Sequence, residues 1–214
     1  MKEARYSVVM ADPPWAYHVD ARTDQGRTSA SHYKTMPLAE LRAMSPQIDG
    51  ATRPRCAMFL WVTSPNLPAG LELLGAWGFK FTTIAFVWHK LNKLPIDDRN
   101  LALAVRKAQG PEAAPLTTYH GRVYRTSFGL GHYTRGGAEV CLLGTRGQLA
   151  RAHRDVEQVI HAPVREHSRK PDEAYERIER LYQGETFLEL FARQKRPGWA
   201  AHGDEKTKFE AGTP

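Results

Sequence analysis

The 214-residue sequence lacks the features that mark several large classes of protein. It has only two cysteines, Cys56 and Cys141, and both lie inside apolar runs, so we expect two buried, reduced thiols rather than a disulfide framework. No apolar run approaches the roughly 18 residues of a membrane-spanning helix. The first residues also lack the basic segment and long apolar stretch of a secretory signal. These absences argue against a membrane partner and predict a cytoplasmic protein.

Motifs for several cofactors are also missing. The nine histidines form no H-x-x-x-H pair and no Cys/His pair at ligand spacing, so we expect no metal. The sequence has no P-loop and no complete G-x-G-x-x-G. The stretch Phe128-Gly129-Leu130-Gly131 has two of those glycines, but it does not lead from a strand into a helix and resembles a hinge or tight turn. An ATP or nicotinamide enzyme is therefore disfavoured.

Positive charge, in contrast, is in excess. The formal net charge is +7, from 30 Lys and Arg against 23 Asp and Glu. Clustered cations bind polyanions by releasing counterions from phosphates, so the balance favours a nucleic-acid partner. The basic residues gather in three groups, which are Arg122, Arg125 and Arg135, then Arg146, Arg151 and Arg154, and finally Arg165, Arg169, Lys170, Arg193, Lys195 and Arg196.

Short apolar runs alternate with amphipathic stretches, which is the pattern of an open α/β sheet. Each run is almost continuous, as is typical of a parallel strand covered on both faces. We expect strands at 6–11, 56–63, 81–88, 139–144 and 186–191, and helices at 37–44, 68–77 and 171–181. Thr35 is the expected N-cap of the first helix, and Gly78 and Gly184 lie just beyond the ends of the other two.

Two segments interrupt this alternation. Residues 17–35 are polar, and residues 90–132 form a long basic stretch with one short helix near 101–108. Loops of this length in a compact domain are often functional, and we expect the second one to face the substrate. We expect residues 1–205 to form one domain and residues 206–214 to form a disordered polar tail.

One four-residue motif carries specific chemistry: Asp12-Pro13-Pro14-Trp15, directly after the strand expected at 6–11. The prolines fix φ at consecutive positions and remove two backbone donors, while their carbonyls stay open to accept hydrogen bonds. A carboxylate, open carbonyls and an indole at a strand end can hold the exocyclic amine of a planar base. Asp-Pro pairs also form ordinary turns that merely end a strand, so the motif alone leaves both interpretations open.

Further blocks follow in order along the chain. They are His32-Tyr33-x-Thr35-Met36, Phe59-Leu60-Trp61-Val62-Thr63, Trp77-Gly78-Phe79, Val87-Trp88-x-Lys90, His167-Ser168-Arg169-Lys170-Pro171-Asp172-Glu173 and Glu189-Leu190-Phe191-Ala192-Arg193. With these blocks, and from about residue 6 to residue 205 apart from 93–127, the sequence resembles the MT-A70-type N6-adenine methyltransferases. The resemblance implies S-adenosylmethionine as methyl donor and a Rossmann-like fold with a mostly parallel sheet and helices on both faces. It also implies a permuted order, in which the catalytic motif precedes the main cofactor-binding strand.

The resemblance implies roles for individual residues. In the family pattern, the acid of the first motif and the carbonyl of the next proline accept hydrogen bonds from the adenine amine, and here these are Asp12 and Pro13. The implied catalytic residues are Asp12, Pro13, Pro14 and Trp15. The implied cofactor-binding residues are Asp12, Lys170, Phe191, Arg193, Asp204 and Glu205, with Asp204 at a position where the family usually has Asn.

We assign the substrate side to six residues. Trp15 and Tyr33 are candidates to stack on the base, Glu139 matches a family acid near the acceptor pocket, and Arg122, Arg125 and Arg135 are candidates for phosphate contacts. Each has a plainer alternative: Glu139 can be a surface salt-bridge partner, and the arginines can belong to a solvated loop. Lys170 can likewise be a solvated lysine at a helix start. Three other aromatic residues, Trp61, Trp77 and Trp88, are expected in the core.

The leading hypothesis is methylation of the adenine N6 amine in DNA by a bacterial or phage-type enzyme. The nearest alternative is the same chemistry on RNA. A non-catalytic nucleic-acid-binding partner subunit and a methyltransferase for a small molecule or a protein amide are further alternatives. The intact Asp12-Pro13-Pro14-Trp15 motif argues against the non-catalytic partner. The sequence leaves a monomer and a homodimer equally open.

Overall fold

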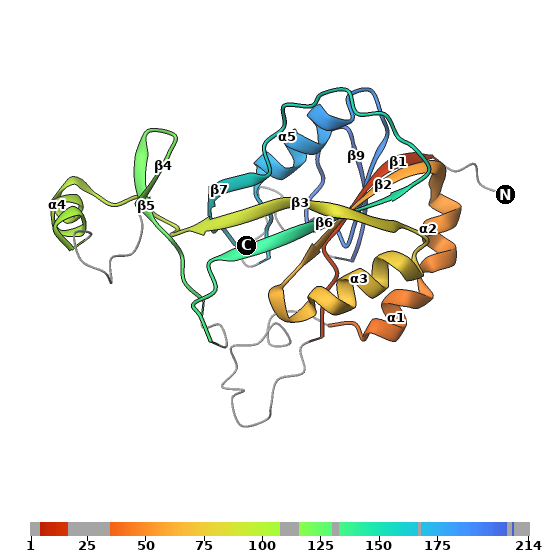
Figure 1. Cartoon of the computed structure of the whole chain (residues 1–214), viewed down its shortest axis with the longest axis horizontal. Helices are drawn as coiled ribbons and strands as arrows, with labels where there is room; N and C mark the ends of the chain where they lie inside the picture. The colour runs from red at the N-terminus through yellow and green to blue at the C-terminus, as the bar shows by residue number, and fades with distance from the viewer. Residues whose placement is uncertain are drawn as a thin grey trace. The chain divides into compact units, whose positions relative to one another are not determined.

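The structure is a computed structural model that describes residues 5–16, 35–107, 116–129, 133–166, 168–204 and 207. A seven-stranded sheet has the strand order β7-β3-β6-β2-β1-β8-β9 (Figure 1). Its strands are β1 (Tyr6–Ala11), β2 (Thr52–Val62), β3 (Lys80–Leu91), β6 (Ala138–Arg146), β7 (Val159–Pro163), β8 (Phe187–Leu190) and β9 (Trp199–His202). The helices are α1 (Leu38–Ala43), α2 (Ser45–Ala51), α3 (Leu67–Ala76), α4 (Asp98–Lys107) and α5 (Asp172–Leu181), with one 3₁₀ turn at Ser64–Asn66.

The sheet is mostly parallel, as predicted. Strand β1 is parallel to β2 and β8, β8 is parallel to β9, and β3 is parallel to β7. The expectation that the run 139–144 is also parallel was wrong, because β6 is antiparallel to β2, with Cys56 opposite Arg146 and Val62 opposite Val140. A continuous apolar run indicates that both faces of a strand are covered, but it does not show whether the strand is parallel or antiparallel to its neighbours.

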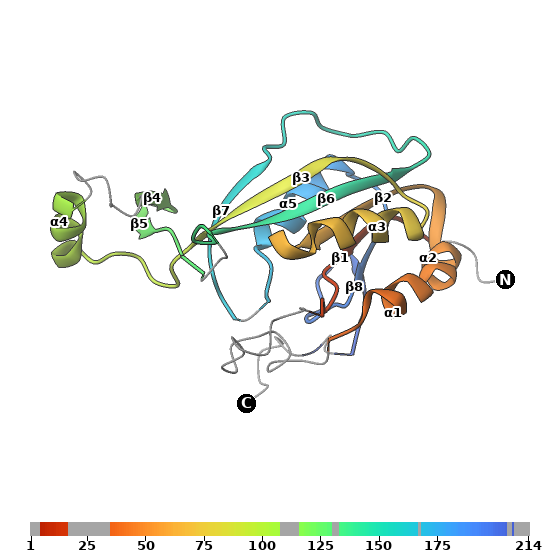
Figure 2. The ribbon, with the colours of Figure 1, turned by 60° about the horizontal axis from the view of Figure 1, so that its bottom comes forward.

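Helices cover both faces of the sheet around β2. Alternate residues of a strand point to opposite faces. Met58 and Leu60 belong to the core cluster that contains Leu74 of α3, and α1 and α3 lie side by side in both views (Figures 1 and 2). The intervening Phe59 meets Tyr182, the residue after α5, edge to face at 6.1 Å between ring centroids. The prediction of a helix-covered α/β sheet is therefore confirmed.

The helix ends agree only partly with prediction. Gly78 ends α3 with φ +79°, and the bonds Gly78 N to Gly75 O and Phe79 N to Leu74 O form a Schellman motif, as Gly78 at this position predicted. Thr35 is not the N-cap of α1, since that position is Pro37 and no side chain caps it. The Pro37 carbonyl accepts the first helical N–H bonds instead.

Contacts between residues divide the chain into two compact units. The first unit comprises Met1–Ala85, Val140–Arg154 and Glu179–Pro214, and the second comprises Phe86–Glu139 and Asp155–Ile178. The predicted core tryptophans are confirmed, because Trp61, Trp77 and Trp88 are each at most 3% exposed. Both cysteines are buried and free, also as predicted.

The basic stretch 90–132 is more ordered than a loop. Within it, helix α4 agrees with the expected short helix, but the structure adds a hairpin of β4 (Leu116–Tyr119) and β5 (Arg122–Arg125) (Figure 1). His120 and Gly121 connect the strands, with φ values of +46° and +73°. Positive φ at both central residues is the geometry of a two-residue type I′ turn. Within the described part of the chain, no helix is long and apolar enough to cross a membrane.

Candidate active site

The acidic turn lies where strand ends of the first unit converge. Ala11, the last residue of β1, is opposite Leu60 of β2 and Leu190 of β8, and Leu190 is in turn opposite His202 of β9. Asp12 therefore begins the segment after β1 directly beside the segment that follows β8, and β9 ends on the other side of β8. In open α/β sheets, ligands bind outside the carboxyl ends of parallel strands, so this edge is the candidate site.

The backbone of the acidic turn is held by two hydrogen bonds. The Pro13 carbonyl accepts from the Trp15 N–H at 2.8 Å, and the Pro14 carbonyl accepts from the Met36 N–H at 2.8 Å. The expectation that both carbonyls are open was therefore wrong, because the turn uses them to fix its own shape. Each carbonyl oxygen has a second lone pair, so Pro13 retains capacity for one further donor. Asp12 itself is half-buried at the start of this turn.

Trp15 is part of the core rather than an exposed cap. Its side chain is 5% exposed, and its indole N–H donates to the Trp61 carbonyl at 3.1 Å. The indole therefore anchors the acidic turn to β2. Stacking of Trp15 on a base stays a prediction.

The segments that follow β8 and β9 touch each other closely. The Ala192 N–H donates to the His202 carbonyl at 3.0 Å, and a Cβ added to Gly203 would lie 2.6 Å from the Ala192 nitrogen. Only glycine allows this approach. Phe191, between β8 and this crossing, has φ +59° and packs its half-buried ring against the core. Positive φ is a genuine outlier for a bulky residue and marks a strained position at the candidate site.

Two further cofactor candidates extend the same edge of the first unit. Arg193 is half-buried two residues after the strained Phe191, and Asp204 is exposed directly after Gly203. Asp12, Phe191, Arg193 and Asp204 thus all follow the carboxyl ends of adjacent parallel strands. Tyr33 and Glu205 lie outside the described residues.

In the second unit, Glu139 bridges two lysines. One oxygen, Oε1, is 2.6 Å from Lys90 Nζ, and the other, Oε2, is 3.0 Å from Lys170 Nζ. Glu139 and Lys170 are 16% and 8% exposed, so this is a buried ion pair and not the surface pair considered from the sequence. Burial alone would raise the pKa of Glu139, but the two ammonium groups outweigh it and lower the pKa from 4.5 to about 2.

Removing this charge should destabilise the protein strongly at neutral pH. Glu139→Gln leaves the buried Lys170 ammonium and the half-buried Lys90 ammonium without this counter-charge, so we expect a loss of roughly 3–5 kcal/mol in urea unfolding at pH 7. Because folding lowers the pKa of Glu139, its contribution is full above about pH 4.5 and is lost as the pH falls towards 2. The difference between variant and wild type should therefore narrow below pH 4.5.

The matched control is Glu72→Gln, which breaks the exposed pair of Glu72 with Arg42. It should cost less than about 1 kcal/mol. An equal loss in the two variants, or a difference for Glu139→Gln that does not change with pH, would contradict a buried role for Glu139.

The backbone at Lys170 is also fixed. Arg165 donates to the Lys170 carbonyl at 2.8 Å and to Asp172 Oδ2 at 2.6 Å. Ser168, two residues earlier, has φ +64°, a second strained non-glycine position beside a motif residue. The structure thus shows a constrained, buried Lys170, which rules out the plainer alternative of a solvated lysine.

The arginines proposed for phosphate contacts do not form one face. Arg122 and Arg125 lie three residues apart on β5, so their side chains leave opposite faces of the hairpin. Arg122 is exposed, Arg125 is half-buried, and Arg135 is exposed in a separate segment. The Tyr119 hydroxyl of β4 donates to Glu173 Oε1 at 2.6 Å, which ties the hairpin to α5.

Sequence reasoning missed three residues at these positions. Lys90 was part of a recognised block, and its approach to Glu139 could have been suspected from that block. Gly203 belongs to the block Gly203-Asp204-Glu205, but its close backbone approach depends on the fold, and Tyr119 gave no signal because its long-range hydrogen bond also depends on the fold. Within the described segments, no group of three His, Cys, Asp or Glu residues could hold a metal ion.

A mostly parallel α/β sheet, with an acidic turn after β1 and a constrained strand end at β8, defines a Rossmann-like methyltransferase fold. The MT-A70 family model matches residues 6–108 and 116–205, and the chain belongs to this family. The expectation that 93–127 falls outside the resemblance was wrong, since the match omits only 109–115 between its two segments.

Similar proteins occur in plants, animals and bacteria. The chain is 33% identical over 206 residues to an N(6)-adenosine-methyltransferase MT-A70-like protein of Arabidopsis thaliana, covering 94% of this chain and 24% of that protein. A Drosophila melanogaster protein of that description is 32% identical over 207 residues, covering 94% and 27%. Type II methyltransferase M.MunI of Mycoplasma sp is 27% identical over 218 residues, covering 94% and 78%. The chain thus spans about a quarter of the length of the first two relatives.

Proposed function

We propose that this protein transfers the methyl group of S-adenosylmethionine to the N6 amine of adenine in a nucleic acid. The observation that carries this proposal is the position of Asp12, at the carboxyl end of β1 and next to the strained end of β8. The family of the chain and the names of its relatives support the same reaction.

The strand ends of the first unit fit S-adenosylmethionine. The acidic Asp204 after β9 suits ribose hydroxyls, as an acid at this place does in other nucleotide-binding sheets. The glycine at 203 lets two backbones meet and leaves Phe191 and Arg193 beside Asp204. Lys170 is proposed for the carboxylate of the methionine part, on the basis of its family motif and its positive charge. When bound, S-adenosylmethionine supplies an electrophilic methyl group on a sulfonium.

Asp12 and Pro13 act on the amine. The nitrogen lone pair of adenine is delocalised into the ring, so the amine is a weak nucleophile. A carboxylate and a carbonyl that both accept its N–H groups favour a pyramidal nitrogen with its lone pair directed away from them. The negative charge of Asp12 also stabilises the positive charge that develops on the nitrogen. Asp12 need not be a strong base, because the proton leaves only after the new C–N bond has formed.

We propose DNA as the polymer. Two relatives with long additional sequence are named for adenosine, whereas the chain covers 78% of a relative named as a type II methyltransferase. The basic hairpin suits either polymer, since phosphate contacts carry no information about the sugar. A base inside a duplex would have to be flipped out of the stack to reach Asp12.

A comparison of polymers tests this choice. Duplex DNA, single-stranded DNA and RNA of the same base sequence would each be incubated with S-adenosylmethionine and digested to nucleosides for mass spectrometry. We expect N6-methyl-2′-deoxyadenosine from DNA. N6-methyladenosine from RNA alone would favour the alternative polymer, and no N6-methylation of any polymer would refute the proposed reaction.

The exposed Arg122 should contact phosphate. We expect Arg122→Ala to weaken nucleic-acid binding about equally for different base sequences and to reduce the slope of log affinity against log salt by about 1. Binding of S-adenosylmethionine should not change. Arg125→Ala should change this salt slope by a different amount, because the Arg125 side chain lies on the opposite face of β5. Arg42→Ala, at an exposed position of α1, is the control, and an unchanged salt slope in Arg122→Ala would exclude this contact.

A further inference from the structure

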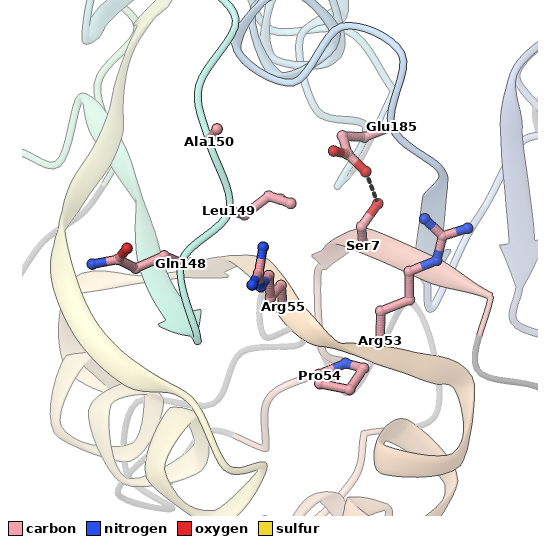
Figure 3. A pocket seen from close by; sticks show the side chains of 8 residues that line it. All are labelled: Ser7, Arg53, Pro54, Arg55, Gln148, Leu149, Ala150 and Glu185. Carbon is pink, nitrogen blue, oxygen red and sulfur yellow. Dashed lines mark hydrogen bonds between the residues drawn. The ribbon is translucent and has the colours of Figure 1, made fainter.

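A pocket of about 470 Å³ lies in the first unit, at the edge of the sheet opposite to the candidate active site. It is lined by Ser7, Arg53, Pro54, Arg55, Gln148, Leu149, Ala150 and Glu185 (Figure 3). Ser7 and Arg53 lie near the starts of β1 and β2, and Glu185 precedes β8, so the pocket is at the amino ends of parallel strands. Its volume is within the roughly 300–1,000 Å³ of small-molecule sites.

An irregularity in strand pairing creates this pocket. Tyr6 pairs with Thr52 and Val8 pairs with Ala57, so the segment 53–56 of β2 stands opposite the single residue Ser7. This bulge directs Arg53 and Arg55 out of the sheet, and both are exposed. In Figure 3 they stand to the two sides of Ser7.

The second wall depends on a glycine. Gly147, after β6, has φ +62°, and an added Cβ would lie 3.1 Å from the Pro54 carbonyl oxygen and 3.2 Å from Arg55 Cγ. This close turn brings Leu149 against the bulge, and Figure 3 shows the Leu149 side chain on the same side of β2 as Arg55. The pocket lining therefore has an apolar side at Leu149 and Ala150, beside Arg55 (Figure 3).

The charges of the lining favour an anion. Among the residues that the structure describes, neither the Arg53 nor the Arg55 guanidinium forms an ion pair, whereas the nearby Arg146 is paired with Asp49 at 2.7 Å. The one acid, Glu185, accepts a hydrogen bond from the Ser7 hydroxyl at 2.6 Å. The pocket thus offers two guanidinium groups, whose planar forks match phosphate oxygens.

We propose that this pocket binds a nucleoside phosphate. Arg53 and Arg55 hold the phosphate, the Glu185 carboxylate accepts the ribose hydroxyls, and Leu149 contacts the base. The exposed Arg151, which directly follows the lining residue Ala150 and has no part in the proposed reaction, adds positive charge. The ligand is either a free nucleotide or one nucleotide of a strand, and this site does not depend on the proposed methyl transfer.

Calorimetric titration with 5′-AMP tests the proposal. Saturating S-adenosylhomocysteine is present so that AMP cannot be read out from the methyl-donor site. We expect Arg53→Ala and Arg55→Ala each to lower AMP affinity about tenfold or more, as the loss of a hydrogen bond to a charged group predicts. Glu185→Gln should lower the affinity for AMP more than the affinity for inorganic phosphate, because only AMP has ribose hydroxyls. Arg42→Ala should leave AMP affinity unchanged.

Two results would overturn the site: no AMP binding by the wild type, or equal AMP affinity in the wild type and the Arg53→Ala/Arg55→Ala double variant. A short single-stranded oligonucleotide distinguishes the two sources. If the oligonucleotide displaces AMP, and Arg53→Ala and Arg55→Ala lower the affinity for the oligonucleotide, the pocket holds a nucleotide of a strand. If AMP binds without displacement, the ligand is a free nucleotide. Failure of the proposed methyl transfer would appear instead as absence of N6-methylation in every polymer tested, with AMP binding by the wild type unchanged.

Discussion

Asp12→Asn should lower the rate of methyl transfer by about 10²–10³-fold, the usual loss when one preorganised electrostatic contact to a transition state is removed. Asparagine keeps the size of the side chain and one acceptor oxygen, but it loses the negative charge that faces the developing positive charge on the amine nitrogen. The backbone bonds of the turn, Trp15 N to Pro13 O and Met36 N to Pro14 O, do not involve this side chain. The fold should therefore be kept.

Single-turnover rates with radiolabelled S-adenosylmethionine measure this effect, and equilibrium binding of the same compound shows whether its site is intact. Asp49→Asn is the matched control, since Asp49 is 74% exposed and pairs with Arg146 on the surface. It should leave the rate unchanged. A wild-type rate in Asp12→Asn would remove Asp12 from the catalytic machinery.

Gly203→Ala should disrupt the strand ends at the candidate site. The new Cβ would lie 2.6 Å from Ala192 N, 2.8 Å from Ala192 O and 2.9 Å from Phe191 C, all of them backbone atoms that cannot rotate away. We expect a loss of roughly 1–3 kcal/mol or more in the free energy of unfolding. Binding of S-adenosylmethionine should be lost as well, because the displaced segments carry Phe191 and Asp204.

Gly50→Ala is the control for this variant, since an added Cβ at Gly50 of α2 meets nothing within 4 Å. It should be neutral or stabilising by about 1 kcal/mol, as alanine favours a helix. If Gly203→Ala unfolds at the same denaturant concentration as Gly50→Ala, the segments that follow β8 and β9 do not constrain each other in solution.

Much of the fold could be predicted because burial leaves a local signal. The run at 6–11 coincides with β1, and the amphipathic stretch at 171–181 contains α5. The direction of β6 left no local signal, since it depends on which neighbour pairs with Cys141 and Leu142. The hairpin at 116–125 did leave a local signal, because His120-Gly121 is a two-residue turn. Strands as short as β4 and β5 are nevertheless easily taken for a loop.

The candidate site could be predicted in its residues but not in its contacts. The motif after β1 and the block at β8 named the residues, and their pairing in the sheet brings Asp12 and Phe191 to adjacent strand ends. The sequence did not show that Trp15 is buried against β2 or that Glu139 lies between two lysines. The Trp15–Trp61 and Lys90–Glu139 contacts join residues that are 46 and 49 positions apart, so only the folded chain shows them.

The position of the transferred methyl group tests the central claim most directly. The nucleic acid found to be the substrate would be incubated with S-adenosylmethionine that carries a deuterated methyl group, and its nucleosides would be resolved by mass spectrometry. We predict the label on N6 of adenine with the wild type and at least about 100-fold less label with Asp12→Asn. Label on a ring nitrogen or on another base, or no label at all, would contradict an amine-directed role for the acidic turn.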